Sequence, residues 1–506
     1  MPVRYYDWIA HHARRTPAKT AMVDLGSNRR FTYAEFDARV GLLASHLRDV
    51  CGVGKGDRVA VLALNATDTL EVQFACFRVG AIFVPLNTRL TVPELQFIVG
   101  DAAPKVMIHD DDLADTAQSV SRLCGVATTL RYGATGSYEQ AIAAAKPLAT
   151  IEPVTLDDVS TIMYTSGTTG QPKGAMITHG MTFYNCVNLG GPAYITPSSV
   201  LLTVLPLFHT GGLNCYTNPV MHVGGTVLIM RAFDPGLALQ LISDPARGIN
   251  VFFGVPAIYQ FMAQHPAFAT ADFSRLVIGG VGGAPMPVAT IERLAAKIPG
   301  LRLVNAYGST ETTSPSTLMP SVLTARHLDS VGLPCPGASI LVMDADGREL
   351  PRGEIGEIWI GGGQVIKGYW NRPDATAESF TAGYWHSGDL GSIDADNFVR
   401  VFDRQKDMIN RGGLKIYSAE VESVLASHPA VVESAIIARP CPVLGERVHA
   451  VVVTREPTSS ETLRSWCAER LSDYKVPETL IVTPDPLPRN ANGKVMKRQL
   501  REALTA

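Results

Sequence analysis

One short segment combines hydrogen-bond donors, glycine and a cation in a way that suits anion binding. Residues 164–174 read YTSGTTGQPKG, with three glycines, four Ser or Thr hydroxyls, one lysine and no acidic residue. Hydroxyl and backbone N–H groups donate to phosphate oxygens, glycine allows close backbone approach, and lysine adds positive charge. The segment predicts a phosphate-binding loop, although an ordinary surface turn can have a similar composition.

Two other nucleotide-binding signatures are absent. Neither Gly-Lys pair, at 54–55 and 493–494, is followed by Ser or Thr, so no G-x-x-x-x-G-K-[ST] loop is present. The G-x-G-x-x-G fingerprint follows none of the candidate strands. A dinucleotide-binding fold therefore has no support.

Seven segments, in one order, resemble the motifs of the adenylate-forming superfamily of acyl- and aryl-CoA synthetases, peptide-synthetase adenylation domains and luciferases. They are YTSGTTGQPKG (164–174), LPLFHTGG (205–212), GGAP (282–285), NAYGSTET (305–312), YWHSGDLG (384–391), DRQKDMINRGGLKIYSAEVE (403–422) and NANGKVMKR (490–498). The resemblance covers nearly the whole chain, and the short segments YNCVN, PLFH and GVPAIYQ also resemble feruloyl-CoA and fatty-acyl-CoA synthetases. It implies an acid–CoA ligase that uses ATP, Mg²⁺ and coenzyme A, forms an acyl-adenylate and then an acyl-CoA, and releases pyrophosphate and AMP.

The resemblance assigns roles to residues around ATP. The phosphates would be held by Thr165, Ser166, Gly167, Thr168, Thr169 and Lys173. Glu311 matches the position associated with Mg²⁺, and His209 a position between the acid and the nucleotide. The adenine slot would comprise Gly283, Ala284, Pro285, Asn305, Ala306, Tyr307, Gly308 and Thr310. Asp389 and Arg404 would bind the ribose.

The resemblance also implies a moving C-terminal domain. Lys494 matches the catalytic lysine that reaches the α-phosphate and the acyl carboxylate, where it would stabilise developing charge. Lys406 matches the hinge residue about which the domain rotates between two closures. In the second closure Gly412 and Gly413 would leave room for the pantetheine arm of CoA, with Lys415 near that interface. A charged surface turn is the simpler alternative for Lys406.

The acid pocket is predicted to be small and uncharged. Its walls are expected at 209–215, 255–259, 281–283, 305–308 and 312–316, and no Lys or Arg falls in these segments. A buried second carboxylate would need a cation, so dicarboxylates are disfavoured. Ala306 stands where relatives with open pockets often have glycine, which favours an aromatic or medium-length monocarboxylic acid.

Three other functions remain open at this point. A stand-alone adenylating enzyme could load a separate carrier protein, although no carrier domain follows the catalytic lysine and free CoA is expected. A luciferase-like oxygenase would emit light with a luciferyl adenylate. A nucleotide sensor would bind ATP without chemistry, which the complete set of charged motif residues disfavours.

The segments between the motifs predict an α/β fold. Strand-like runs such as DRVAVLAL (57–64) alternate with helical runs such as DTLEVQFACFRVGA (68–81), and the same pattern returns in 199–285. This alternation predicts βαβ units with largely parallel sheets. The sequence pattern changes after about Val331. Residues 338–363 predict antiparallel hairpins or a small barrel.

The expected architecture has two domains. A large N-terminal domain (1–402) contains two parallel-type α/β subdomains and a small β-barrel-like subdomain. A hinge (403–408) leads to a small mobile α+β C-terminal domain (409–506) that carries the catalytic lysine. Its first helix, SAEVESVLASHP, is expected to have Ser418 as N-cap.

Composition excludes several functional classes. The chain has 506 residues, a net charge of −3 and 46% hydrophobic residues, so neither nucleic acid nor an anionic membrane surface is an expected partner. Its eight cysteines are scattered singly, as in a reduced cytoplasmic protein. No run approaches the ~20 apolar residues of a membrane span, and the first residues lack the apolar run of a secretory signal. The expected partners are a small carboxylic acid, ATP and CoA, and homodimer formation is left open.

Overall fold

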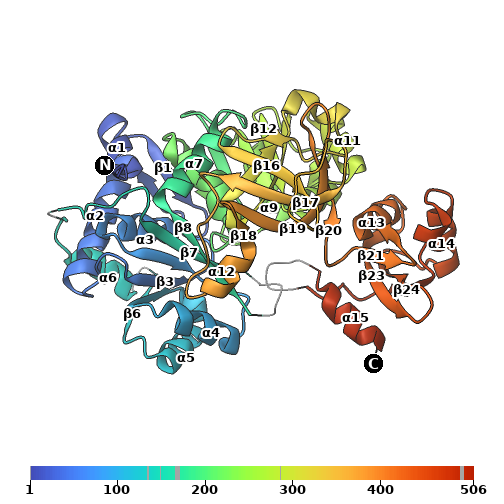
Figure 1. Cartoon of the computed structure of the whole chain (residues 1–506). Helices are drawn as coiled ribbons and strands as arrows, with labels where there is room; N and C mark the ends of the chain where they lie inside the picture. Colours follow the sequence, from blue (N-terminus) through green and yellow to red (C-terminus); the bar gives the residue numbers. More distant parts are fainter. Residues whose placement is uncertain are drawn as a thin grey trace. The chain divides into compact units, whose positions relative to one another are not determined.

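The chain folds into two compact units. The computed structural model describes residues 2–133, 136–148, 150–165, 171–284, 286–489 and 495–505 (Figure 1). The first unit comprises Met1–Met286, Glu292–Ile340 and Ile360–Trp385, and the second comprises Pro287–Ile291, Leu341–Trp359 and His386–Ala506. Each unit has its own hydrophobic core.

The first unit contains a six-stranded sheet in the order β6-β5-β3-β4-β7-β8. Its strands are β3 (Arg58–Leu62), β4 (Ile82–Pro85), β5 (Val106–His109), β6 (Thr128–Arg131), β7 (Val159–Thr165) and β8 (Lys173–Thr178). The helices along this part of the chain are α1 (Trp8–Arg15), α2 (Tyr33–Asp49), α3 (Thr67–Val79), α4 (Val92–Ala102), α5 (Ala114–Cys124) and α6 (Ser137–Ala144). All neighbouring strands are parallel except β7 and β8. The predicted βαβ alternation is confirmed.

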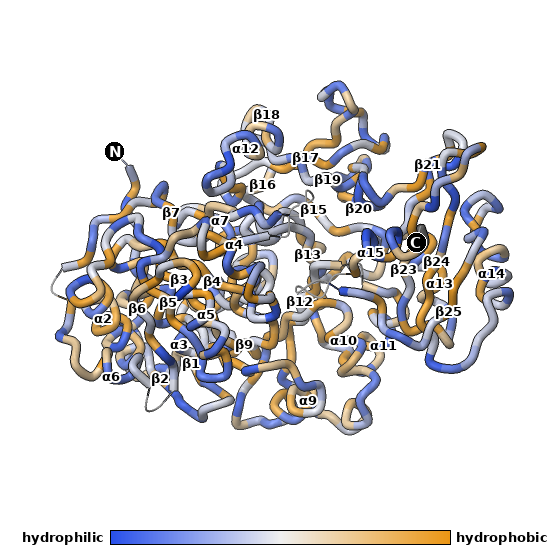
Figure 2. The backbone as a smooth tube through the Cα atoms, turned by 90° about the horizontal axis from the view of Figure 1, so that it is seen from below, coloured by the Kyte–Doolittle hydropathy of each residue, from blue (hydrophilic) through white to orange (hydrophobic). Residues whose placement is uncertain are grey.

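Helices cover both faces of this sheet (Figure 1). Val59 and Val61 of β3 belong to the core that includes α2 and α3, whereas Ala60 and Leu62 belong to a second core with α4 and α5. Successive strand side chains point to opposite faces, so a sheet covered on both sides needs apolar residues at every position. In Figure 2 the backbone has the colour of hydrophobic residues through β3 and β4.

A buried ion cluster joins α2, α3 and α6. Arg39 donates to both carboxylate oxygens of Glu71, at 2.6 and 3.0 Å, and also pairs with Glu139. The hydroxyl of Tyr138 donates to Glu71 at 2.8 Å. Glu71 is fully buried, and this burial raises its pKa to about 7. The arginine therefore compensates a charge that the core would otherwise disfavour.

We expect Arg39→Ala to destabilise the fold by about 3–5 kcal/mol at pH 7.5, because Glu71 then stays buried without its cation. The loss should be smaller at pH 5.5. The folded-state pKa of Glu71 lies above its ordinary value, so the folded state binds a proton between about pH 7 and 4.5 and gains stability as the pH falls. Denaturant unfolding of both proteins at the two pH values measures this, and an equal loss at both would contradict it.

The first unit also contains a nine-stranded sheet in the order β15-β14-β13-β12-β11-β9-β10-β1-β2. Its strands are β1 (Thr20–Asp24), β2 (Arg30–Thr32), β9 (Val200–Thr203), β10 (Thr226–Ile229), β11 (Val251–Gly254), β12 (Ile278–Gly282), β13 (Arg302–Ser309), β14 (Ser314–Leu318) and β15 (Leu333–Pro334). The helical segments along this part of the chain include α7 (His179–Gly190), η2 (Gly211–Thr217), α8 (Asn218–His222), α9 (Pro235–Ser243), α10 (Pro256–Gln264), α11 (Val288–Lys297) and η4 (Thr310–Thr312). The strands from β13 to β1 are parallel, and both edges of the sheet are antiparallel.

Antiparallel pairing dominates after the nine-stranded sheet. Strands β16 (Ala338–Met343), β17 (Gly356–Gly362), β18 (Phe380–Thr381), β19 (Tyr384–Ile393) and β20 (Val399–Arg404) form one sheet, and α12 (Pro373–Ser379) precedes β18. Strand β19 pairs antiparallel with β18 and with β20. This agrees with the hairpins expected after Val331.

The C-terminal part is the expected α+β module. Its strands are β21 (Ile409–Arg411), β22 (Leu414–Ile416), β23 (Val431–Cys441), β24 (Gly445–Thr454) and β25 (Thr479–Thr483), and its helices are α13 (Ser418–Ala426), α14 (Ser460–Ala468) and α15 (Lys497–Thr505). The prediction for Ser418 is wrong, because it is the first residue of α13. Its backbone N–H and its hydroxyl both donate to Asp403, so a carboxylate fifteen residues earlier takes the capping role.

Among the residues that the structure describes, no helix is long and apolar enough to cross a bilayer.

Candidate active site

A β-hairpin holds the two ends of the predicted phosphate-binding loop. Thr165 is the last residue of β7 and Lys173 the first of β8, and they are direct partners in the antiparallel register. The hydroxyl of Thr165 lies 3.5 Å from the carbonyl oxygen of Lys173. The loop residues Ser166, Gly167, Thr168 and Thr169 lie outside the described residues, so their phosphate-binding roles stay predictions.

Both carboxylate oxygens of Glu311 accept hydrogen bonds. Oε1 accepts from the hydroxyls of Thr165 at 3.4 Å and Tyr369 at 3.2 Å, and Oε2 accepts from Ser309 at 3.0 Å. The indole N–H of Trp385 donates to the Tyr369 hydroxyl at 3.4 Å. The fold thus joins two predicted residues, Thr165 and Glu311, to three that sequence reasoning missed.

Lys173 completes this group, which we call the phosphate-end cluster: Thr165, Lys173, Ser309, Glu311, Tyr369 and Trp385. The Lys173 ammonium lies 5.2 Å from the centroid of the Tyr369 ring, within the range of a cation–π contact. Tyr369 is only 6% exposed, and this burial raises the pKa of its hydroxyl. The hydroxyl therefore remains a hydrogen-bond donor throughout the neutral range.

The donor set of the cluster fits a magnesium–phosphate complex. Mg²⁺ prefers oxygen ligands and is usually bound by one or two carboxylates together with substrate phosphates. Glu311 supplies a carboxylate, and Lys173 supplies positive charge for phosphate oxygens. Among the residues that the structure describes, no group of three His, Cys, Asp or Glu side chains could hold a metal ion alone. Phosphate oxygens of bound ATP would complete the coordination, as is usual for Mg²⁺.

The backbone after Glu311 is strained. Thr313 and Ser314 have φ angles of 56° and 132°, which non-glycine residues rarely adopt. Such residues cost on the order of 1–3 kcal/mol each and persist only where their surroundings hold them. Here the Thr313 hydroxyl donates to the carbonyl of Gln364 at 2.8 Å, and reciprocal bonds between Ser309 and residue 312 close the preceding turn. The Glu311 carboxylate is thus presented on a constrained turn.

The residues of the predicted adenine slot lie where β12 and β13 end. Strand pairing places Gly282 opposite Ala306. A Cβ on Gly308 would lie 2.3 Å from the carbonyl oxygen of Ser314, so glycine is required where β13 and β14 approach. The described members of the slot are Gly283, Ala284, Asn305, Ala306, Tyr307, Gly308 and Thr310; Pro285 lies outside the described residues. Tyr307 is half-buried beside this close approach.

His209 precedes η2, at the start of the predicted acid-pocket wall. Its Nδ1 accepts a hydrogen bond from the backbone N–H of Gly211 at 3.2 Å. In the neutral imidazole this leaves the proton on Nε2, so that nitrogen is a donor. The side chain can therefore hydrogen-bond a carboxylate without acting as a base.

The second unit brings together the two predicted ribose-binding residues. Asp389 of β19 and Arg404 of β20 are register partners and form an ion pair at 2.7 Å. Arg404 also donates to the carbonyl of Ser387 at 3.3 Å. A carboxylate oxygen can accept more than one hydrogen bond, so this pairing leaves Asp389 able to accept from ribose hydroxyls.

The remaining predicted residues also belong to this unit. Lys406 lies in an exposed turn between β20 and β21. Gly412 and Gly413, with φ angles of 59° and 88°, are the two central residues of the β21–β22 hairpin, and such turns require positive φ at both. The hairpin turn itself therefore gives both glycines a structural reason. Lys415 is exposed, and Lys494 lies outside the described residues.

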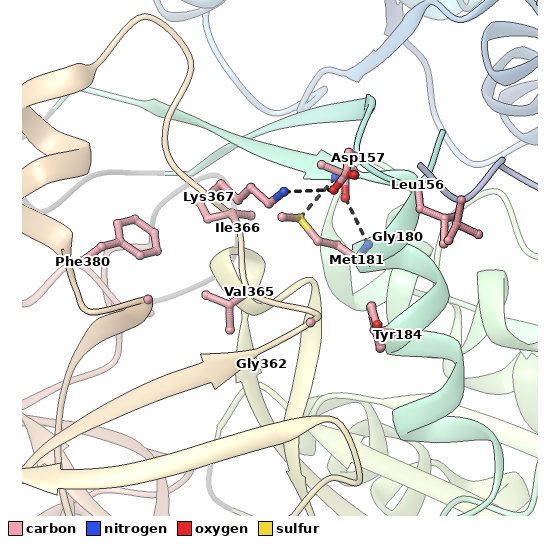
Figure 3. Close-up of a pocket in the computed structure, with 14 residues that line it drawn as sticks. Leu156, Asp157, Gly180, Met181, Tyr184, Gly362, Val365, Ile366, Lys367 and Phe380 are labelled. Atoms are coloured by element: carbon pink, nitrogen blue, oxygen red, sulfur yellow. Dashed lines mark hydrogen bonds and ion pairs between the residues drawn. The ribbon is translucent and has the colours of Figure 1, made fainter. Parts of the chain in front are cut away.

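A separate cavity of about 580 Å³ lies within the first unit (Figure 3). Its lining includes Met181, Val365 and Phe380, and an ion pair of 3.1 Å joins Lys367 to Asp157 beside it. None of the predicted site residues that the structure describes lines it. Ile366 borders it, and the backbone N–H of that residue donates to the carbonyl of Glu311 at 2.8 Å.

Family models and curated proteins give a consistent result. The model for AMP-binding enzymes matches residues 9–370, and the model for the AMP-binding enzyme C-terminal domain matches residues 420–494. The chain is 40% identical over 496 residues to a feruloyl-CoA synthase of Amycolatopsis sp., covering 98% of each chain. It is 35% identical over 504 residues to a long-chain-fatty-acid–CoA ligase of Mycobacterium tuberculosis, again covering 98% of each.

Solved structures extend the similarity to the whole fold. ATP-bound MatB from Rhodopseudomonas palustris superposes with a TM-score of 0.90 at 34% identity, covering 99% of both chains. O-succinylbenzoate coenzyme A synthetase from Bacillus subtilis, in complex with ATP and magnesium ion, gives a TM-score of 0.89 at 31% identity, covering 98% of this chain and all of that one. The predicted α/β fold with a large N-terminal and a small C-terminal domain is confirmed.

Proposed function

We propose, since the chain belongs to the AMP-binding enzyme family, that it activates an aromatic (cinnamate- or benzoate-type) or medium-chain monocarboxylic acid. The reaction class is that of an AMP-forming acid–CoA ligase with ATP, Mg²⁺ and CoA. The acid and ATP give an acyl-adenylate and pyrophosphate. The CoA thiol then displaces AMP to give the acyl-CoA.

The proposal of a monocarboxylic acid rests on the uncharged wall of the expected acid pocket. The segments that contribute to it contain no Lys or Arg. The thiol of Cys215 contacts the hydroxyl of Ser314, so η2 packs directly on β14 here. A second carboxylate buried between these elements would be unpaired and would cost several kcal/mol.

Aromatic packing beside the same wall supports a flat, short acid. The ring of Tyr216 stacks on Phe253 with centroids 4.9 Å apart. It occupies the space beside Gly280, where a Cβ would lie 2.5 Å from the tyrosine oxygen. Tyr216 and the methyl of Ala306 would limit the depth available to an acyl chain. The similarity to a feruloyl-CoA synthase favours the aromatic acids within this range.

Each of the described site residues would have its own role in the adenylation step. Thr165 and Lys173 would bind the phosphates with the loop between them, while Tyr307 stacks on adenine and Asp389 with Arg404 binds the ribose. His209 would orient the acid carboxylate through Nε2–H. Bound Mg²⁺ would neutralise phosphate charge during the attack on the α-phosphate.

The C-terminal residues would act in sequence. Lys494 would stabilise the charge that develops during adenylation. The C-terminal domain, which begins near residues 402–403, would then rotate about Lys406. This rotation would remove Lys494 from the site of thioester formation and bring in Gly412, Gly413 and Lys415. An exposed turn at Lys406 supports this, since such turns absorb backbone rotation.

An acid panel tests the proposed substrate class. We expect the highest kcat/KM for CoA-dependent AMP formation on cinnamates, benzoates or medium-chain acids, and values at least about 100-fold lower on dicarboxylates because of the unpaired charge. Linear acids from acetate to palmitate complete the panel. A maximum on a dicarboxylate would contradict the proposal, and AMP release without a thioester would indicate a carrier protein as acceptor.

We further propose that the enzyme works in the cytoplasm without a nucleic-acid partner. All eight cysteines are free thiols in the structure, and the net charge is −3. Both features suit a reducing compartment and small-molecule substrates.

A further inference from the structure

Tyr369 contacts both charged side chains of the phosphate-end cluster. Its hydroxyl donates to Glu311 at 3.2 Å, and its ring lies under the ammonium of Lys173 at 5.2 Å. It comes from the connection between β17 and α12, 58 residues after Glu311 in the chain. No motif quoted above includes it, and nothing in its sequence surroundings marks it.

We propose that Tyr369 is a positioning residue for adenylation: its hydroxyl orients the Glu311 carboxylate for magnesium, and its ring places Lys173 for the phosphates. This role rests on the functions proposed for Glu311 and Lys173. Tyr369 itself touches neither metal nor phosphate in this assignment. It would act only by fixing the geometry of the two groups that do.

The backbone of Tyr369 is anchored to the strand that begins with Lys173. Tyr369 forms a bridge with Ala175 of β8, and the next residue, Trp370, donates its N–H to the carbonyl of Gly174 at 2.8 Å. The N–H of Tyr369 itself donates to the hydroxyl of Thr376 at 2.9 Å. Lys173 and Tyr369 are therefore held on one rigid frame, which fixes where the ring meets the ammonium.

The hydroxyl direction is set from the other side. Trp385 is buried, and its indole N–H can only donate, so the Tyr369 oxygen must be the acceptor in that contact. The Tyr369 proton is directed to the Oε1 atom of Glu311, because a carboxylate can only accept. A chain of this kind strengthens each bond within it. Trp385, Tyr369 and Glu311 thus form a directed relay of hydrogen bonds.

Two substitutions separate the functions of the hydroxyl and the ring. Tyr369→Phe keeps the ring beneath Lys173 and removes only the bond to Glu311. Tyr369→Leu removes both. Tyr138→Phe is the matched control, because the Tyr138 hydroxyl also donates to a carboxylate, that of Glu71 at 2.8 Å, and both residues lie outside the cluster.

Metal binding provides the decisive readout. Mn²⁺ binding to the enzyme–ATP complex is followed by electron paramagnetic resonance, and ATP binding without metal by calorimetry. Loss of a residue that orients a metal ligand typically costs 10- to 100-fold in metal affinity. We expect a loss of about that size for Tyr369→Phe with metal-free ATP affinity unchanged, whereas Tyr369→Leu should weaken both. Tyr138→Phe should bind Mn²⁺ and ATP as the wild type does.

The outcomes distinguish the positioning role of Tyr369 from the metal-binding role proposed for Glu311. If Glu311→Gln leaves Mn²⁺ affinity unchanged, the proposed metal site is wrong. If Glu311→Gln weakens it while Tyr369→Phe does not, the site stands and the positioning role is overturned. An equal loss for Tyr138→Phe and Tyr369→Phe would also overturn it. Thermal unfolding checks that each variant folds, and Trp385→Phe, which should weaken Mn²⁺ binding through the same relay, replaces Tyr369→Phe if that protein is unstable.

Discussion

Glu311→Gln should lower the rate of acyl-adenylate formation by at least about 100-fold, the range observed when one preorganised electrostatic group is removed. The amide keeps the size of the side chain and an oxygen that can accept from Tyr369. It lacks the negative charge that a magnesium ligand needs. The effect should therefore be electrostatic, and a higher Mg²⁺ concentration should recover part of the rate.

Acid-dependent exchange of labelled pyrophosphate into ATP measures this step without CoA. Glu292→Gln, on the exposed surface of α11, is the matched control and should retain wild-type exchange. A wild-type rate in Glu311→Gln would remove Glu311 from the reaction. A loss accompanied by a large fall in the unfolding temperature would instead assign it a structural role on its strained turn.

Lys494→Ala should lower adenylation by about 100- to 1000-fold while leaving thioester formation from a preformed acyl-adenylate close to wild type. The side chain is expected to stabilise charge at the α-phosphate, which develops only in the first step. In the second step the same domain would present other residues. Because Lys494 lies outside the described residues, this expectation depends on the motif NANGKVMKR alone.

The two half-reactions are measured separately, one by pyrophosphate exchange and the other by CoA thioester formation from synthetic acyl-adenylate. Arg498→Ala is the control, because this exposed cation four residues later pairs only weakly, at 3.3 Å, with Glu502 on the surface of α15. Equal losses in both half-reactions would argue against domain alternation. Unchanged adenylation would show that Lys494 is not the catalytic lysine.

Local patterns were sufficient to predict most elements. The run VAVLAL predicts a strand buried on both faces, and β3 is such a strand between two helical layers. The helix predicted to end near Gly80 does so, since that glycine adopts φ of 70° at its C-terminus. These features depend on neighbours within a few residues, so the sequence contains the information directly.

The cap of α13 shows where local patterns fail. Serine before a helical run is a common N-cap, and Ser418 was predicted as one. The fold instead places Asp403 against the start of the helix, and Ser418 donates to it. A partner fifteen residues away, beyond a hairpin, leaves no signal in the helix sequence.

The sequence by itself was enough to predict the reaction class and the fold, because seven motifs in one order resemble those of the adenylate-forming superfamily. Only the tertiary structure decided how the phosphate end is held together. Tyr369, Trp385 and Ser309 join Glu311 to Thr165 and Lys173, and the longest of these contacts, between Lys173 and Tyr369, spans 196 residues of chain. Such contacts follow from the packing of whole strands and turns, and no local pattern of residues encodes them.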